Sequence, residues 1–194
     1  MQETRFVRGR VMSDMVLRTD AAEFGWPDSL YDVLVRQHVR QVAYVPDAGH
    51  SRLIERCADN PDMVSTVLTT EEEGVALLAG AWLGGDRGVL LMQSSGVGNC
   101  INMFTLIENC RLPLMTLVTM RGEWGEFNPW QAQMGQATPD ILTRMGIQVH
   151  CVDEPGDAAP TLDAAIRQSY DGMLPSAVLL SQRLIGRKAF NEEG

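Results

Sequence analysis

The chain has 194 residues, 45% of them hydrophobic, which is enough for one domain with a sizeable core. Sixteen Lys and Arg against 25 Asp and Glu give a formal net charge of −9. Because no basic cluster offsets that charge, its field repels phosphate backbones, and we expect no nucleic-acid partner. No apolar run approaches the roughly 20 residues that a membrane span requires, so we expect a soluble protein without a membrane partner.

The four cysteines have no CxxC spacing, and no secretory segment precedes them. This pattern predicts reduced thiols that serve as small core residues, and a cytoplasmic location.

Residues 1–25 mix charges of both signs without clear periodicity, which indicates an N-terminal extension ahead of one domain over residues 26–194. In that domain, short apolar runs rich in β-formers alternate with helical patterns. The runs predict strands at 41–47, 63–70, 87–95, 113–120, 147–152 and 176–182. The patterns between them predict helices at 27–40, 49–59, 71–84, 98–110, 137–145 and 157–172. Such alternation is typical of a doubly wound α/β domain, with a mainly parallel sheet of about six strands and helices on both faces.

In sheets of this kind, ligands gather at the carboxyl ends of the strands. The loops predicted there are VPDAGHS, TTEEEG, QSSGVGN, the long MRGEWGEFNPWQAQMGQATPD, and DEPGD. We therefore expect the functional residues in these loops.

Three consecutive glutamates, Glu71 to Glu73, open the predicted helix 71–84, and each shares its helix face with apolar residues. A helix that is apolar all round is buried, either in the core or against another chain. A threonine cap with a glutamate in the first turn accounts for two of the three carboxylates. The third is costly to bury without a partner, which makes it a candidate for proton chemistry.

The segment EEEGVALLAGAWLGG, followed by GVLLMQSSGVGNCINMFTLIENCRLPLMTLVTMRGE, resembles the pyrimidine-binding (PYR) domain of thiamine-diphosphate enzymes. The resemblance covers roughly residues 27–185. Those domains carry a glutamate nine residues before a helix glycine, and nine residues before Gly80 stands Glu71. VPDAGHSRLI, EEEG and RGExGEFNPxQxxMGQAT are similar to the alpha subunits of sulfopyruvate decarboxylases and to phosphonopyruvate decarboxylases.

The resemblance implies that Glu71 is the catalytic residue, with Glu72 or Glu73 as alternatives in another register. In this family the glutamate hydrogen-bonds ring nitrogen N1′ of the cofactor's aminopyrimidine and so activates thiamine diphosphate for attack on a 2-keto acid. The favoured reaction is decarboxylation of sulfopyruvate to sulfoacetaldehyde. The alternatives are phosphonopyruvate decarboxylation and carboligation of the acetolactate-synthase kind.

The chain has no GDG motif followed by an Asn pair, which the family uses to hold Mg²⁺ and the diphosphate. GGDRG at 84–88 indicates a helix-ending turn instead. The resemblance therefore implies a GDG-bearing beta subunit, an α/β heteromer, and no metal bound by this chain alone. The apolar helices 71–84 and 98–110 are expected to form the contact. A non-catalytic stabilising subunit remains the alternative.

Ser95, Gly96 and Asn99, in SSGVGN, are expected by the resemblance to approach the cofactor and the partner subunit. This segment is predicted as a turn whose backbone N–H groups could also cradle a phosphate, so a nucleotide-binding module is a third interpretation. Ile101 replaces the third glycine of the dinucleotide fingerprint, which argues against it.

Two residues of the first loop are candidates for binding a small anionic 2-keto acid. Asp47 lies where related decarboxylases place substrate-facing groups, although their acidic residue often falls one position later, at Ala48 here; a turn-forming aspartate is the alternative. His50 orients a substrate carboxylate or simply begins the next helix. His38, on a helix, and His150, in a strand, are predicted to be structural.

Arg121 and Gln136 are the other two candidates for substrate binding. A guanidinium directly after the fourth strand can pair bidentately with a sulfonate, phosphonate or carboxylate, although an exposed salt bridge is its alternative role. Gln136 aligns with a family glutamine near the active site, or caps the following helix. The loop at 122–133, which carries three aromatic residues, is predicted to be a lid or an interface segment.

Overall fold

The computed structural model describes residues 25–186, so the predicted extension, except for Gly25, lies outside the described residues. Six strands form one sheet in the order β2-β1-β3-β4-β6-β5, and every neighbouring pair is parallel. The strands are β1 (Val39–Tyr44), β2 (Val64–Val67), β3 (Arg87–Gln93), β4 (Met115–Thr119), β5 (Gln148–Val152) and β6 (Ser176–Leu180). The predicted doubly wound α/β fold is confirmed.

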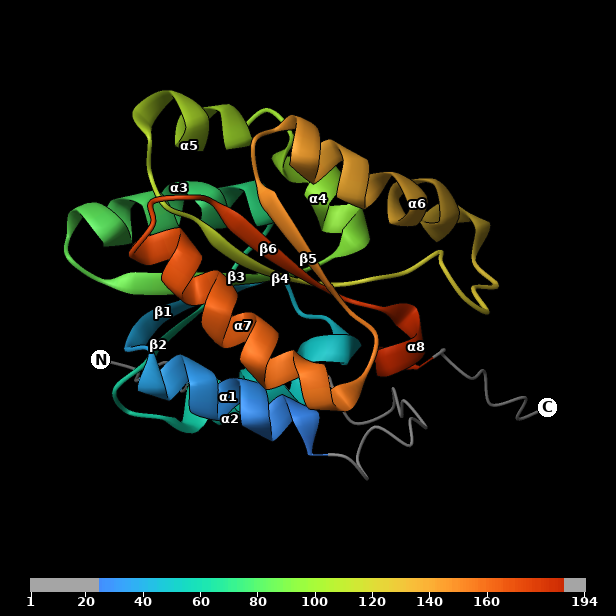
Figure 1. Ribbon diagram of the computed structural model, residues 1–194, viewed down its shortest axis with the longest axis horizontal. Helices are drawn as coiled ribbons and strands as arrows, with labels where there is room; N and C mark the ends of the chain where they lie inside the picture. Colours follow the sequence, from blue (N-terminus) through green and yellow to red (C-terminus); the bar gives the residue numbers. More distant parts are fainter. Residues whose placement is uncertain (1–24, 187–194) are drawn as a thin grey trace, which may run out of the picture.

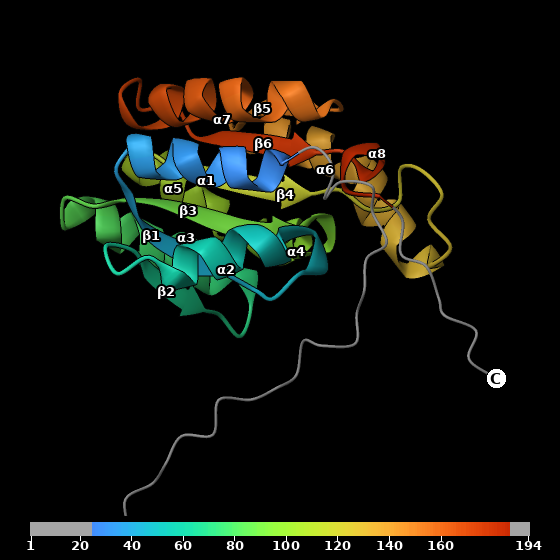
Figure 2. The same cartoon turned by 90° about the horizontal axis from the view of Figure 1, so that it is seen from below.

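Helices cover both faces of this sheet (Figures 1 and 2). One face carries α1 (Trp26–Arg36), α2 (Ser51–Asp59) and α7 (Pro155–Tyr170), and the other carries α3 (Glu71–Leu83), α4 (Ser94–Cys100), α5 (Phe104–Cys110) and α6 (Pro129–Arg144). The short helices η2 (Ala48–His50) and α8 (Gln182–Ile185) follow β1 and β6 at the carboxyl edge.

The central strands are apolar on both faces because each face has its own core. Val89 and Leu91 of β3 belong to the core under α1, α2 and α7, whereas Leu90 and Met92 belong to the core under α3 to α6. Successive side chains point to opposite faces of a strand, so a run without alternation is what a sheet covered on both sides requires. No helix among residues 25–186 is long and apolar enough to span a membrane.

Two of the wrongly predicted boundaries lie close to Glu71 and the segment that follows β3. The predicted strand 87–95 ends at Gln93, and α4 begins at once with Ser94, so SSGVGN is a helix and not an open turn. The predicted helix 98–110 breaks before Phe104, where the Asn102 carbonyl accepts hydrogen bonds from the backbone N–H and the side-chain hydroxyl of Thr105. Apolar periodicity runs through that break, because Val97 and Cys100 of α4 and Phe104 and Ile107 of α5 belong to the same core.

The predicted loop 122–133 is shorter than expected because α6 begins at Pro129, not at residue 137. The Asn128 side chain caps this helix by accepting a hydrogen bond from the Trp130 N–H at 3.1 Å. Proline is favoured in the first turn of a helix, where its missing N–H has no partner to lose. The predicted helix 27–40 is too long: α1 ends at Arg36, and His38 lies in a turn with a φ of 56°.

The prediction that all four cysteines lie in the core holds for only two. All four are free thiols: Cys57 and Cys100 are buried, whereas Cys110 and Cys151 are exposed. Cys110 is the last residue of α5, and Cys151 belongs to β5, the edge strand of the sheet. Burial raises the pKa of Cys57 and of Cys100 to about 12.

Gly135 lets α6 approach the end of β4, since a Cβ at this position would lie 1.6 Å from the carbonyl oxygen of Arg121. We predict that Gly135→Ala lowers the free energy of unfolding by about 3 kcal/mol, because backbone must move to admit the methyl group. Chemical denaturation of the two chains measures the difference. Gly156→Ala is the control, since a Cβ there meets nothing within 4 Å. Equal stability of the Gly135 variant and the parent would contradict the close approach.

Candidate active site

Glu71 is the first residue of α3 and is buried, with 8% of its surface exposed. Its Oε2 accepts a hydrogen bond from Asn99 Nδ2, on α4, at 2.8 Å. The N-terminal end of a helix favours a negative charge through its dipole and its unpaired N–H groups. The two helices therefore hold one buried carboxylate in a fixed orientation.

Gly96 of α4 makes room for this carboxylate. A Cβ on Gly96 would lie 2.4 Å from Glu71 Oε1, so the carboxylate occupies the space that a side chain would fill. Among residues 25–186, Oε1 has no hydrogen-bond donor, and it is not fully enclosed. The site thus presents one carboxylate oxygen to an outside donor, as binding to a protonated or amino-substituted ring requires.

The other two glutamates have different surroundings. Glu73 Oε2 accepts from the backbone N–H of Thr69 at 3.0 Å, whereas the carboxylate half of a capping box would accept from the N–H of the N-cap, Thr70. The threonine half is missing, since Thr70 is the N-cap but makes no side-chain capping bond. Glu72 is exposed. Of the three glutamates that could take the role of the family glutamate, only Glu71 is buried beside α4.

Asp47 connects three strands at their carboxyl ends. Its Oδ2 accepts from the Gly49 N–H at 3.0 Å and from Thr119 Oγ1 at 2.8 Å. Its Oδ1 accepts from Gln93 Nε2 at 3.0 Å. Ser95 Oγ in turn donates to Gln93 Oε1 at 3.0 Å. Because Asp47 follows β1, Gln93 ends β3 and Thr119 ends β4, the bonds span adjacent strands of the sheet.

This network ends at Ser95, which precedes in sequence the Gly96 against which the Glu71 carboxylate lies. The structure therefore brings together Glu71, Gly96 and Asn99, with Asp47 and Ser95 beside them, as the sequence placed them at one edge. Sequence reasoning missed Gln93 and Thr119. Both are polar residues near the carboxyl ends of predicted strands, which was the available signal.

His50 lies inside the protein, with 1% of its surface exposed. Its Nε2 lies 3.3 Å from the Met92 carbonyl oxygen and 3.1 Å from the Leu117 carbonyl oxygen. Carbonyl oxygens only accept, so Nε2 carries the proton, and Nδ1 has no partner. Burial lowers the pKa of His50, with the nearby Asp47 charge opposing this effect. His50 is thus a neutral donor to the backbone of β3 and of the neighbouring β4.

Arg121 is engaged within the chain. Its Nη2 lies 2.6 Å from Glu126 Oε2, with 7% and 5% of the two side chains exposed. Burial acts to raise the pKa of Glu126, but hydrogen bonds from the Asn128 N–H, Arg121 and Gln182 outweigh it and hold this pKa below its ordinary value. The guanidinium therefore has a buried counter-ion rather than an exposed salt bridge. Gln136 lies exposed on α6.

Gln182, the first residue of α8, ties down the segment that follows Arg121. Its Oε1 accepts from the backbone N–H groups of Glu123 and Trp124, both at 3.0 Å, and its Nε2 donates to Glu126 Oε2 at 3.0 Å. Its own N–H donates to Glu123 Oε2 at 3.1 Å. Sequence reasoning missed both Glu126 and Gln182. The segment between β4 and α6 is consequently held by buried polar bonds along its first half.

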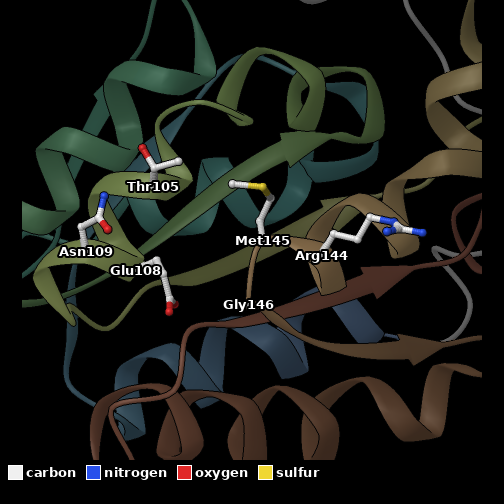
Figure 3. A pocket seen from close by; sticks show the side chains of 6 residues that line it. All are labelled: Thr105, Glu108, Asn109, Arg144, Met145 and Gly146. Atoms are coloured by element: carbon white, nitrogen blue, oxygen red, sulfur yellow. The ribbon is translucent and has the colours of Figure 1, made fainter.

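A surface pocket of about 250 Å³ lies elsewhere, between α5 and the connection from α6 to β5. It is lined by the six residues labelled in Figure 3, Thr105, Glu108, Asn109, Arg144, Met145 and Gly146. This connection enters β5 at its amino end, so the pocket is at the opposite edge of the sheet from Asp47. None of the predicted site residues lines it. Residues 25–186 contain no group of three or more His, Cys, Asp or Glu side chains suited to a metal ion.

Comparison with known families identifies the class of protein to which this chain belongs. Residues 27–149 match the thiamine pyrophosphate enzyme family, in its N-terminal TPP binding domain. The match covers more than half of the chain and includes Glu71, Gly96 and Asn99. The chain belongs to the thiamine pyrophosphate enzymes.

The chain is also similar to individual proteins of known name. The chain is 31% identical, over 79% of its length and 92% of the relative, to "Sulfopyruvate decarboxylase subunit alpha" of Methanococcus maripaludis. It is 35% identical, over 79% of its length, to "Phosphonopyruvate decarboxylase" of Streptomyces viridochromogenes, of which it spans only 40%. Among solved structures, 2-oxoglutarate:ferredoxin oxidoreductase from Magnetococcus marinus matches with a TM-score of 0.64 over 87% of this chain and 34% of that one. At 11% identity, this last likeness shows the shared fold alone.

The buried His50 makes stability depend on pH. Because burial lowers its pKa from the ordinary value of 6.5, the unfolded chain takes up a proton near that pH while the folded chain does not. We predict that the free energy of unfolding falls as the pH drops from 7 toward 5, by at most about 1.4 kcal/mol per pH unit from this group. Denaturant titrations at several pH values measure the slope. His50→Gln should flatten it, with His38→Gln, at an exposed position, as the control; an unchanged slope in His50→Gln contradicts the assignment.

Proposed function

We propose that this chain is the pyrimidine-binding subunit of a two-subunit thiamine-diphosphate-dependent 2-keto-acid decarboxylase, with sulfopyruvate to sulfoacetaldehyde and CO₂ as the favoured reaction. Family membership, together with relatives named as decarboxylases, makes the chain part of a thiamine-diphosphate-dependent decarboxylase. The observation that carries the proposal is the Glu71 carboxylate, buried at the head of α3 with Oε1 against Gly96 and open to a ligand.

The residues at this site fit the cofactor. When bound, thiamine diphosphate supplies the electron sink that accepts the electron pair left as CO₂ departs. Glu71 accepts a hydrogen bond at Oε1 and so holds a proton at a ring nitrogen of the cofactor's pyrimidine. Asn99 keeps the carboxylate from turning by holding Oε2, and Gly96 leaves the space that the carboxylate occupies. Because the carboxylate is already buried and oriented, little reorganisation accompanies the reaction.

We propose that Mg²⁺ and the diphosphate are held by a separate beta subunit with a GDG motif, since this sequence contains none. The outer face of α3 supports such a partner. Ala76, Gly80 and Leu83 lie along this face and are exposed, Leu83 with 77% of its surface. An exposed apolar face on a helix whose other side is in the core is suited to burial against another chain. We place the resulting α/β heteromer in the cytoplasm.

The proposed substrate is a small anionic 2-keto acid bound at the carboxyl edge of the sheet. Of the four candidates, Asp47 is the one whose hydrogen bonds lead through Gln93 to Ser95, the residue before Gly96. Arg121 and His50 already have buried partners, which favours roles in shaping the site, and Gln136 is exposed on α6. Phosphonopyruvate is the second candidate substrate, favoured by the relative that bears its name. A carboligase subunit of the acetolactate-synthase kind would use the same carboxylate.

We predict that Glu71→Gln lowers turnover of the assembled enzyme at least about 100-fold while assembly persists. The neutral amide cannot replace the negative charge that the buried Glu71 carboxylate places beside the cofactor ring. Sulfopyruvate and phosphonopyruvate are assayed separately with thiamine diphosphate and Mg²⁺, by this chain alone and with the GDG-bearing protein encoded beside it.

Glu72→Gln is the matched control for this experiment, since Glu72 is exposed one residue along the same helix. Turnover only in the mixture, abolished by Glu71→Gln and kept by Glu72→Gln, supports the proposal. Unchanged turnover in Glu71→Gln would leave the chain a stabilising subunit, and turnover by this chain alone would contradict the two-subunit arrangement.

The proposed interface on α3 gives a further prediction. Gly80 is exposed, and a Cβ there meets nothing within 4 Å, so Gly80→Leu should leave the thermal stability of the isolated chain at or above that of the parent. If the outer face of α3 binds the partner, the added side chain weakens assembly at least about tenfold through steric conflict. Titration calorimetry with the GDG-bearing protein measures the dissociation constant of the complex. Gly156→Leu, also at an open exposed glycine but on α7, is the control; equal affinities would exclude this face.

A further inference from the structure

The side-chain amide of Gln93 is held in one orientation. Its neighbour on one side is the Asp47 carboxylate, which only accepts hydrogen bonds, so Gln93 must turn Nε2 toward Asp47 Oδ1, at 3.0 Å. The amide oxygen then faces Ser95, whose hydroxyl donates to it at 3.0 Å. The hydrogen bonds therefore run in one direction, from Ser95 through Gln93 to Asp47.

This arrangement leaves one hydrogen of Gln93 Nε2 unused. A primary amide has two N–H donors, and within residues 25–186 only Asp47 accepts from this one. The Gln93 side chain is partly exposed, so the second N–H can meet a ligand. Gln93 stands three residues before Gly96, against which the Glu71 carboxylate lies.

The negative charge of Asp47 is turned away from a ligand at this position. Three donors converge on its carboxylate, from Gly49, Thr119 and Gln93. The amide of Gln93 presents positive N–H character outward while its inner N–H satisfies the carboxylate. A site for an acid can therefore contain this aspartate without repelling its substrate strongly.

Building on the proposed function, we propose that Gln93 binds the substrate, donating the free Nε2 hydrogen to an oxygen of the anionic 2-keto acid. Asp47 and Ser95 are then positioning residues, which act by fixing the amide. The assignment gives Asp47 a role through Gln93 and not through direct proton transfer.

The test compares two glutamine-to-methionine variants in the assembled enzyme, with sulfopyruvate and phosphonopyruvate as the probes. Gln93→Met keeps the length of the side chain and removes the donor, so KM should rise about 10- to 100-fold while kcat changes much less. Gln41→Met is the matched control, because Gln41 donates its amide to Asp86 at 2.9 Å in the same manner but at the amino edge of the sheet. Its KM should stay within about twofold of the parent value.

A second variant, Gln93→Glu, separates substrate binding from a structural role. It sets a second carboxylate against Asp47, and two like charges at this distance share a proton as the pH falls. The titratable and charged groups on the surrounding segments are Asp47, His50, Glu71 and the Arg121–Glu126 pair. KM for Gln93→Glu should be high at neutral pH and fall toward that of Gln93→Met at lower pH, relative to the parent enzyme at each pH.

Several outcomes would overturn the inference. One is a Gln93→Met enzyme that behaves like Gln41→Met; another is a loss confined to kcat and melting temperature with KM unchanged; a third is a Gln93→Glu enzyme whose KM follows the parent at every pH. If the unsubstituted complex decarboxylates neither acid, the proposed function fails and this inference fails with it. If the complex is active and Gln93→Met is normal, only the role of Gln93 is lost.

Discussion

Burying the Glu71 carboxylate is the constraint on which the arrangement of this edge depends. A buried charge is costly unless its surroundings are polar, and here the head of α3 and the amide of Asn99 provide them. The space comes from Gly96, where a Cβ would meet the carboxylate, and α4 must begin directly after β3 to put that glycine in place. One functional group thus accounts for the start of one helix, the composition of another and the absence of a turn between β3 and α4.

The rest of the edge is built from polar groups that satisfy one another. Asp47 gathers donors from the ends of adjacent strands, and Glu126 gathers Arg121, Gln182 and a backbone N–H. Polar networks buried in this way are rigid when every member has a partner, because each broken bond leaves an unsatisfied group. Such rigidity suits a site that must hold a cofactor ring and a small acid in fixed relation.

Much of this could be predicted from the sequence. Uninterrupted apolar strands separated by single helices define the doubly wound fold, and the glutamate spaced from Gly80 directs attention to Glu71. The start of α4 could not be predicted, because Ser94, Gly96 and Gly98 favour a turn in isolation and only tertiary contacts make them helical. Gln93 was missed for a related reason, since its significance lies in Asp47, 46 residues earlier in the chain. The buried partner of Arg121 could not be predicted, because Glu126 lies in an irregular segment with no periodic signal.

The distribution of the four thiols gives the protein a chemical asymmetry. Cys100 belongs to α4, and burial, with the charges of Glu71 and Glu72 adding to it, raises its pKa to about 12. At neutral pH this thiol stays protonated, and it is shielded from solvent. Cys110, at the end of α5, and Cys151, one residue before the end of β5, are exposed. Maleimide dyes would therefore label Cys110 and Cys151 and spare Cys100, so that a dye at the end of α5 could report on assembly by fluorescence without altering any cysteine.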